Sequence, residues 1–334
     1  MNKTVLSLTQ SLLGASIPVL CYHQVRPESG MTPEKFGSHL DLIRKMGFET
    51  ISLARLHEII TEKEKPTAPA IVITFDDCTL DNWVYAVPEL LRRSMHGVFF
   101  AITDFLRPGQ ARLRADQGGQ THIPRFDEIM GQALQGNCEW FMNHGEVRAV
   151  VHDLGMEVYS HSAAHQACFT SNEPNGTLGD EKHWSHKALC GPNAATDSPV
   201  YPVGSAYAHA GFGLDWHGNQ LSLDTREDRQ DFCLKDFSYS KKNLENILDQ
   251  PCPFLCLPWG QLDEVTIEAA QLAGFQCTLN LKSDVTAPDI APMQIGRLAV
   301  KDRKTLPWLR LKILLLAHQA LAPWAAGLHF GRRT

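Results

Sequence analysis

The sequence predicts an α/β fold built on a parallel sheet, and three observations support this prediction. Short apolar runs rich in β-branched and aromatic residues alternate with segments of helical periodicity along most of the 334 residues. Three helical segments end in a glycine that leads directly into the next apolar run, at 45–51, 153–159 and 272–278. Apolar residues make up 43% of the chain and charged residues 20%, as expected of a chain that buries a large core.

Seven short apolar runs are predicted to be buried strands, because strands covered on both faces are continuously hydrophobic. In chain order they are Ile17–Tyr22, Ala70–Phe75, Gly97–Ile102, Glu157–Ser160, Phe254–Leu257, Gln276–Leu281 and Gln294–Val300.

Helices are predicted between these strands. The first begins at Thr32 and Pro33, an N-cap residue followed by proline at the first helical position, and repeats apolar residues with helical spacing. Similar segments cover Trp83–Ser94, Glu146–Leu154 and Asp263–Ala273. In a parallel α/β fold, functional side chains are expected where the strands end and the loops begin.

Two long stretches, about 107–140 and 166–238, interrupt the alternation and are expected to be insertions. The second is rich in Gly, Pro, Asn, Asp and His and also carries four large aromatic residues, which favours a structured insertion over a disordered loop. The aromatic residues are Trp184, Tyr201, Tyr207 and Trp216.

Charge and cysteine content exclude some classes of function. The chain has 31 basic and 37 acidic residues, a net charge of −6, so no basic surface indicates a nucleic-acid partner. Nine scattered cysteines without a C-x-x-C pair indicate reduced thiols and favour a cytoplasmic protein. The apolar stretch within Met1–Ser16 is a weak secretory signal, so a periplasmic location stays the alternative.

Two polar motifs follow predicted strands. Asp76 and Asp77 come directly after the apolar strand Ala70–Phe75. Because neighbouring side chains in an extended chain point to opposite sides, one carboxylate can bind a metal while the other transfers a proton. His161 and His165 follow the strand Glu157–Ser160. In a helical turn, histidines four residues apart share one face and can converge on one ion. Either motif alone is often structural; both together predict a site.

These motifs resemble those of the polysaccharide deacetylases, the NodB-homology family also called carbohydrate esterase family 4. The T-F-D-D-G motif of that family is similar to Thr74–Cys78, and its H-[ST]-x-x-H motif is similar to His161–His165. The R-x-P-[YF]-G motif is recognisable in part in Cys256–Gly260, and the opening L-x-Y-H resembles Leu20–His23.

The resemblance implies a distorted (β/α) barrel over about 17–304 with one divalent metal ion, commonly Zn²⁺. By position, Asp77, His161 and His165 would be the metal ligands and Asp76 the catalytic base. Three protein ligands leave one coordination position open, as a hydrolytic metal site requires. By the same resemblance, Trp259, Pro258 and His23 would contact substrate, and the backbone N–H near Trp259 would bind the oxyanion.

The chain departs from the family pattern at three points. Cys78 replaces the usual glycine, which fits if the local φ is negative. Cys256 stands where many members have an arginine that braces the base, and Arg297 is predicted to replace it; the alternative is an arginine in an ordinary ion pair. The late L-x-H motif, which supplies the general acid, is missing. His23, His183, His186, His209 and His217 are the alternatives for a proton donor.

Residues 305–334 form a predicted apolar helix with a basic tail, too short and too interrupted to span a membrane. The stretch 306–330 could pack against the barrel or a partner subunit, or lie peripherally on the inner membrane. Contact with a membrane would favour a glycolipid substrate.

The leading hypothesis is a metal-dependent hydrolase that removes N-acetyl groups from a saccharide or glycolipid. An amidohydrolase acting on a small non-sugar amide is the first alternative, favoured if the 166–238 insertion closes over the metal; an open groove favours a polymer. A barrel that binds saccharide without cleaving it is the second alternative. The acidic charge and the absence of a deaminase motif exclude a nucleic-acid enzyme.

Overall fold

The structure is a computed structural model that describes residues 16–28, 30–64, 68–119, 122–180, 182–282, 291–318 and 321. Its centre is a set of parallel strands that lie side by side in chain order. They are β1 (Val19–Tyr22), β3 (Ala70–Phe75), β4 (Val98–Ala101), β5 (Glu157–Ser160), β12 (Phe254–Cys256), β13 (Cys277–Asn280), β14 (Ile295–Gly296) and β15 (Leu298–Ala299), with β2 (Glu49–Thr50) paired to the start of β3.

The last two strands join the edges of this sheet. β14 pairs with β13, β15 pairs with β1, and only Arg297 separates the two segments. The sheet is therefore a nearly closed barrel of eight parallel strands, which confirms the predicted barrel. The predicted strands all form, because their apolar runs are the segments that the barrel buries. β3 and β5 have the predicted bounds, the predicted strand Gln294–Val300 is divided at Arg297 into β14 and β15, and the others are one or two residues shorter at their ends.

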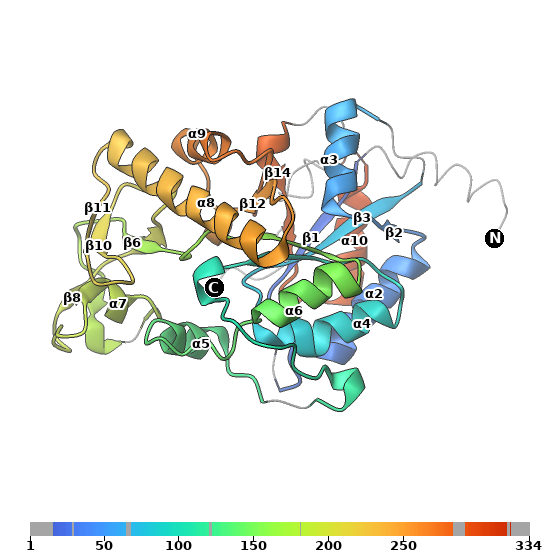
Figure 1. Ribbon diagram of the computed structural model, residues 1–334, viewed down its shortest axis with the longest axis horizontal. Coiled ribbons are helices and arrows are strands. Elements are labelled where there is room, and N and C mark those ends of the chain that lie inside the picture. The colour runs from blue at the N-terminus through green and yellow to red at the C-terminus, as the bar shows by residue number, and fades with distance from the viewer. Residues whose placement is uncertain are drawn as a thin grey trace.

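Helices surround the barrel (Figure 1). They are α2 (Pro33–Lys45), α3 (Leu53–Glu62), α4 (Val87–Leu91), α5 (Phe126–Ala133), α6 (His144–Arg148), α8 (Arg226–Leu248), α9 (Glu264–Leu272) and α10 (Leu306–Leu316). Two predicted helices contain a π-helical turn, Asn82–Ala86 before α4 and Ala149–Asp153 after α6. The cap of α2 is as predicted, with the Thr32 side chain accepting the backbone N–H of Lys35.

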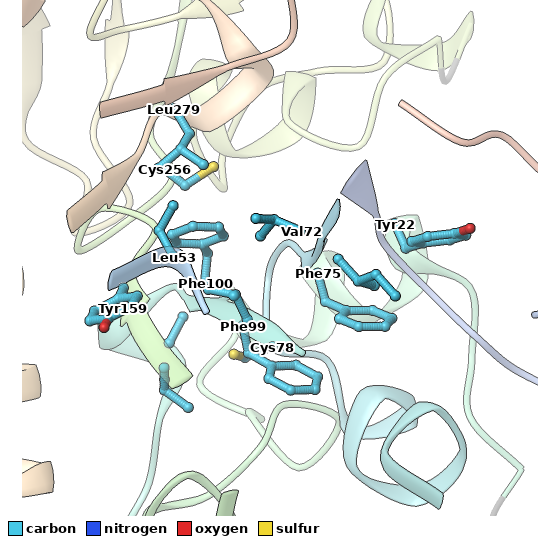
Figure 2. Packing of buried hydrophobic residues seen from close by; sticks show 14 of the residues in the cluster. Tyr22, Leu53, Val72, Phe75, Cys78, Phe99, Phe100, Tyr159, Cys256 and Leu279 are labelled. Atoms are coloured by element: carbon cyan, nitrogen blue, oxygen red, sulfur yellow. The ribbon is translucent and has the colours of Figure 1, made fainter. Parts of the chain in front are cut away.

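Aromatic side chains fill the layer between the barrel and α2. Tyr22, Phe75 and Phe99 come from three neighbouring strands, and the rings of Phe75 and Phe99 stack at 4.8 Å (Figure 2). Phe36 of α2 meets Phe75 edge-on at 5.5 Å. This packing fixes the strand ends of β1 and β3, from which the site residues project.

The second insertion is structured but shorter than the sequence suggests. It contains a four-stranded antiparallel sheet, a two-stranded ladder and the short helix α7 (His186–Cys190), at the end of the molecule beyond α8 (Figure 1). Its strands are β6 (Ala167–Phe169), β7 (Gly176–Thr177), β8 (Pro199–Val200), β9 (Val203–Ser205), β10 (Phe212–Leu214) and β11 (Gln220–Ser222). From Arg226 onward the expected insertion is the 23-residue helix α8, which packs on the barrel.

The C-terminal helix α10 packs against α2, and its side chains Leu309, Ile313 and Leu316 are buried. Leu306 at its start and Leu311 are 39% and 37% exposed. Of the predicted stretch 306–330, residues 319, 320 and 322–330 lie outside the described residues, as does most of Met1–Ser16. Within the described ranges, none of the helices combines the length and the hydrophobicity that crossing a membrane requires.

Candidate metal centre and catalytic site

Both aspartates at the end of β3 are buried, with exposed fractions of 2% for Asp76 and 3% for Asp77. The chain turns sharply here, because Asp77 and Cys78 have φ values of 73° and 49°. The expectation of a negative φ at Cys78 is therefore wrong: this side chain occupies the left-handed region that glycine adopts without strain. Non-glycine residues in this region cost free energy and cluster at functional sites.

Asp77, His161 and His165 converge at the mouth of the barrel. The Nε2 atoms of His161 and His165 lie 3.5 and 3.8 Å from Oδ1 of Asp77, and one donor atom of each residue lies within 4.8 Å of the other two. The loop between the histidines is not the helical turn that the spacing predicts, since Ser162 and His165 have φ values of 68° and 50°. The imidazoles meet because the loop, not a helix, folds them together.

The donor set fits a divalent cation. Nδ1 of His161 lies 2.9 Å from the backbone carbonyl of Cys256, so donating its proton there leaves Nε2 with a lone pair directed at Asp77. Burial lowers the pKa of His161 to about 4, which keeps the imidazole neutral at pH 7. A tetrahedral ion with bonds of about 2.0–2.2 Å separates its donors by roughly 3.3–3.6 Å.

The surroundings of Asp77 also fit a bound cation. Burial, and after it the charge of Asp76, raise its pKa well above the usual range. Its ion-pair partners among the described residues are the two imidazoles, which burial keeps neutral. A buried carboxylate beside a second carboxylate and two neutral imidazoles is costly, and a bound cation would reduce that cost.

Arg297 holds Asp76 in a fixed orientation. Its Nη1 and Nη2 donate to Oδ1 and Oδ2 of Asp76 at 2.6 and 2.8 Å, and Nη1 also donates to Oγ1 of Thr74 at 3.0 Å. Burial alone would raise the pKa of Asp76, but the guanidinium charge lowers it well below the usual range, so the carboxylate stays ionised. Arg297 lies between β14 and β15, and from there its guanidinium contacts Asp76 as the sequence predicts.

Two thiols complete the surroundings of Asp76. Sγ of Cys21 and Sγ of Cys256 donate to its two carboxylate oxygens at 3.4 and 3.6 Å. Nη2 of Arg297 donates to Sγ of Cys256 at 2.9 Å, so the residue at the family's arginine position contacts both the base and the guanidinium that replaces that arginine. Burial raises the pKa of both thiols well above the usual range, which keeps them protonated hydrogen-bond donors.

The three residues predicted to contact substrate differ in their exposure and in their distance from the site. His23 is half-exposed, and its Nε2 lies 3.9 Å from Oδ2 of Asp76 at the mouth. The Trp259 ring stacks on His165 with ring centroids 6.0 Å apart, and Trp259 has a φ of 65°. Pro258 is buried, so it shapes the turn that carries Trp259.

The alternative proton donors are dispersed. His183 stacks on Trp259 at 5.3 Å, and His186 lies beside His183. Nε2 of His209 lies 3.1 Å from Oε1 of Gln261, whereas His217 is exposed in a turn. Among them and His23, only His23 has a described contact with Asp76.

The helix α8 contributes a residue that sequence reasoning missed. Asp236 accepts the backbone N–H groups of Ala163 and Ala164 at 2.8 and 3.3 Å, in the middle of residues 161–165, the candidate metal-binding loop. The Tyr207 hydroxyl donates to the same carboxylate at 2.8 Å. Burial raises the pKa of Asp236 to about 7. The capping pattern Thr225-x-x-Asp228 and apolar residues at helical spacing after it could have revealed α8, but not the contact of Asp236.

Comparison with known proteins identifies the family. A sequence model of the family described as polysaccharide deacetylase matches residues 63–278, which is more than half of the chain. The chain belongs to the polysaccharide deacetylase family. The family prediction is thereby confirmed.

One curated relative is similar over part of its length. YxkH of Bacillus subtilis, which carries the same family name, is 30% identical over 90 residues, covering 26% of this chain and 32% of the relative. The match thus spans about a third of the relative's length.

Solved structures share the fold. A de-N-acetylase from Aggregatibacter actinomycetemcomitans superposes with a TM-score of 0.60 at 18% identity, covering 90% of this chain and 99% of the other. IcaB from Ammonifex degensii gives a TM-score of 0.57 at 18% identity, covering 94% and 98%. A Streptococcus pyogenes deacetylase solved with acetate gives 0.52 at 14% identity, covering 90% and 99%.

Proposed function

We propose that this polysaccharide deacetylase removes N-acetyl groups from a saccharide by divalent-metal-dependent hydrolysis. The observation that carries the proposal is the joint geometry at the barrel mouth. Two imidazole nitrogens and one carboxylate oxygen converge beside a second carboxylate that an arginine holds ionised. Separate groups for metal binding and for proton transfer are what amide hydrolysis at neutral pH requires.

Asp77, His161 and His165 would hold the ion, and the mixed nitrogen and oxygen donors favour Zn²⁺. When bound, such an ion supplies a Lewis acid for the amide carbonyl and lowers the pKa of a water molecule to about 7. His161 keeps the correct nitrogen free because its Nδ1 proton is directed at the carbonyl of Cys256.

Asp76 is the general base of this proposal. Its oxygens accept from Arg297 and from two thiols, so the carboxylate is ionised and fixed before substrate arrives. A base with so low a pKa accepts a proton only as the attacking water becomes strongly acidic, which makes Asp76 dependent on the neighbouring cation. Arg297 acts through Asp76 and is a positioning residue.

The substrate would be an N-acetylated saccharide. Support comes from the family and from the de-N-acetylase among the structures with the same fold. The aromatic rings of Trp259 and Trp184 beside His165 offer flat apolar surfaces of the kind that contact sugar rings.

Metal analysis and acetate release test the proposal together, with wild type, His161→Ala and Asp76→Asn compared side by side. We expect about one divalent ion per wild-type chain and acetate release from N-acetylated saccharides. His161→Ala should lose both, whereas Asp76→Asn should keep the metal and lose turnover by roughly 10²–10⁴-fold. Metal-free wild type after supplementation, or a fully active Asp76→Asn, would contradict the mechanism.

A further inference from the structure

The helix α10 carries apolar side chains on two of its faces. The buried face is formed by Leu309, Ile313 and Leu316. Leu311, Leu314 and Leu315 are also at helical spacing and form another face, where Leu311 is 37% exposed and the other two are half-buried. A helix that is apolar all round is normally buried on all sides. The second face of α10 is only partly covered within the part of the chain that the structure describes.

Large exposed apolar side chains are concentrated in this segment. Among the described residues six such side chains are exposed, and three of them are Leu306, Leu311 and Leu321. Half-buried Trp308 lies one turn before Leu311, and Nζ of Lys304 lies over its ring at 4.9 Å. Tryptophan and lysine can place an apolar body against lipid and a polar tip in water. This composition is typical of helices that lie at a membrane interface.

The same segment has a charge opposite to that of the chain. Residues 301–316 contain five basic residues and one acidic residue, a net charge of +4, whereas the whole chain carries −6. Of the five basic residues, only Lys312 is buried. The neighbouring helix α2 does not cancel this charge, because it has three basic and two acidic residues and its Asp41 pairs with Arg93 at 2.9 Å. We call the exposed side of residues 301–316 the docking surface.

The docking surface begins at the mouth of the barrel. Lys301 and Asp302, which follow β15, line a cleft of ≈720 Å³ together with His23. The charged residues of its lining, three basic and two acidic, are Arg26, Arg125, Lys301, Asp127 and Asp302. Nε2 of His23 lies 3.9 Å from Oδ2 of Asp76. A partner that contacts the docking surface therefore comes to the rim of the candidate catalytic site.

The chemistry of the docking surface favours one kind of partner. A second copy of this chain would bring two surfaces of the same sign together. A nucleic acid would contact the basic groups and leave the leucine face in water. Anionic lipids match both features, because their head groups attract basic residues and the acyl region accepts apolar side chains. With 11 residues, α10 is shorter than the roughly 20 needed to cross a bilayer.

We propose that the docking surface binds an anionic lipid bilayer, with α10 lying in the plane of the membrane. Trp308 and Leu311 enter the boundary between head groups and acyl chains, while Arg303, Lys304 and Arg310 contact anionic head groups. Binding does not depend on turnover. One consequence rests on the proposed function: the barrel mouth lies at the membrane surface, so a saccharide carried on a lipid comes within reach of the site.

Sedimentation of the full chain with lipid vesicles tests the proposal. We expect binding to vesicles of mixed phosphatidylglycerol and phosphatidylcholine, and much weaker binding to phosphatidylcholine alone. Raising the salt concentration from about 0.1 M to about 1 M shortens the screening length from roughly 10 Å to 3 Å and should release protein from the anionic vesicles.

Two variants separate the contributions of charge and of apolar contact. Arg310→Gln removes one exposed charge and should weaken binding to anionic vesicles by about fivefold. Leu311→Ser removes an exposed apolar side chain and should weaken it by roughly threefold to tenfold. Lys242→Gln on α8 and Leu272→Ser on α9 are the matched controls, because both side chains are exposed on other helices. The controls should bind as wild type does, and the Tm should stay close to that of wild type in all four variants.

The outcomes separate this proposal from the proposed function. Vesicle binding that is absent in wild type, equal on neutral and anionic vesicles, or unchanged in both Arg310→Gln and Leu311→Ser would overturn the docking surface. A dimer that dissociates in Leu311→Ser, in a protein that binds no vesicles, would assign the surface to a second copy and overturn it as well. Binding to anionic vesicles by a protein that releases no acetate from N-acetylated saccharides would support the docking surface and contradict the proposed function. Acetate release without vesicle binding would do the reverse.

Discussion

Residue 297 carries a charge that the family pattern places at position 256. The guanidinium of Arg297 donates to Asp76 through both terminal nitrogens and lies over the Phe100 ring at 5.5 Å. Arg297 is 1% exposed. A bidentate pair fixes the plane of the carboxylate as well as its charge. The thiol of Cys256 leaves room for this guanidinium, so the two departures from the family pattern compensate each other.

Arg297→Lys separates charge from geometry. Lysine retains a positive charge but lacks the planar fork, so Asp76 should stay ionised and lose its fixed orientation. We expect kcat/KM to fall by roughly 10–100-fold with metal content unchanged. Arg226→Lys is the matched control, because Arg226 contacts both oxygens of Glu268 at 2.7 Å on the exposed surface. Unchanged activity in Arg297→Lys would show that charge alone suffices.

Asp236 offers a second test at this scale. Asp236→Asn replaces one accepting oxygen by a donor and should release one backbone N–H of the metal-binding loop. Partners of this kind typically contribute 10–100-fold in metal affinity, so we expect a loss of about tenfold in affinity for Zn²⁺. Glu245→Gln on the same helix is the control, since Glu245 accepts the N–H of Cys252 away from the loop. Equal metal affinities in the two variants would remove Asp236 from the site.

Among the elements, β1 and α2 meet at a buried histidine. His39 of α2 is fully buried, and its Nδ1 lies 3.2 Å from the Tyr22 hydroxyl of β1. Burial, and after it the charge of Lys35, lower the pKa of His39 to about 4. The folded state therefore holds a neutral imidazole where the unfolded chain has an ordinary pKa of about 6.5.

This shift predicts the sign of a pH effect on stability. The contribution of neutral His39 is complete above pH 6.5 and is lost as pH falls toward 4, because protons then bind preferentially to the unfolded chain. Between pH 6.5 and pH 4, we expect the unfolding free energy of wild type to fall by about 3 kcal/mol more than that of His39→Leu. Denaturant melts of both proteins between pH 4 and 7.5 measure it; parallel curves would show that His39 does not titrate on unfolding.

Elements differed in how well the sequence predicted them. The barrel strands were predictable because continuous apolar runs such as Ala70–Phe75 have few other solutions. The start of α8 was hidden inside a polar stretch, although Cys233, Phe237 and Leu244 lie at helical spacing. The metal-binding loop was predicted as a helical turn because residue spacing alone does not reveal the positive φ values at Ser162 and His165.

The candidate site was likewise predictable in part. Asp76, Asp77, His161 and His165 were predictable from motifs at strand ends, and Arg297 from the need to replace a missing charge. Contacts between distant segments were not predictable: Asp236 reaches the metal-binding loop over 73 residues of chain. The ring of Trp184, from the second insertion, lies 6.4 Å from the ring of His165, a contact that residue spacing does not reveal.

For the whole molecule, metal binding should stabilise the fold. The three proposed ligands lie at the ends of two strands, so an ion would link β3 to β5 only in the folded chain. At a free Zn²⁺ concentration 100 times Kd, we expect about 2.7 kcal/mol of stabilisation and a rise of roughly 5 °C in Tm. A chelator should reverse the rise, and His161→Ala should not show it. A Tm indifferent to metal in wild type would contradict the site.

Arg297 lies between β14 and β15, the strands that close the barrel, and this position determines when a newly made chain can complete its site. The polypeptide leaves the ribosome from its N-terminus, and 221 residues separate Asp76 from the guanidinium that it requires. A nascent chain ending at β13 can align most of the barrel but leaves a carboxylate with no cation to hold it. Closure of the barrel and completion of the base therefore happen in one event, late in synthesis. On the proposed mechanism, prematurely terminated products lacking the final strands would be inert, and the reaction would require a chain whose translation has passed this point.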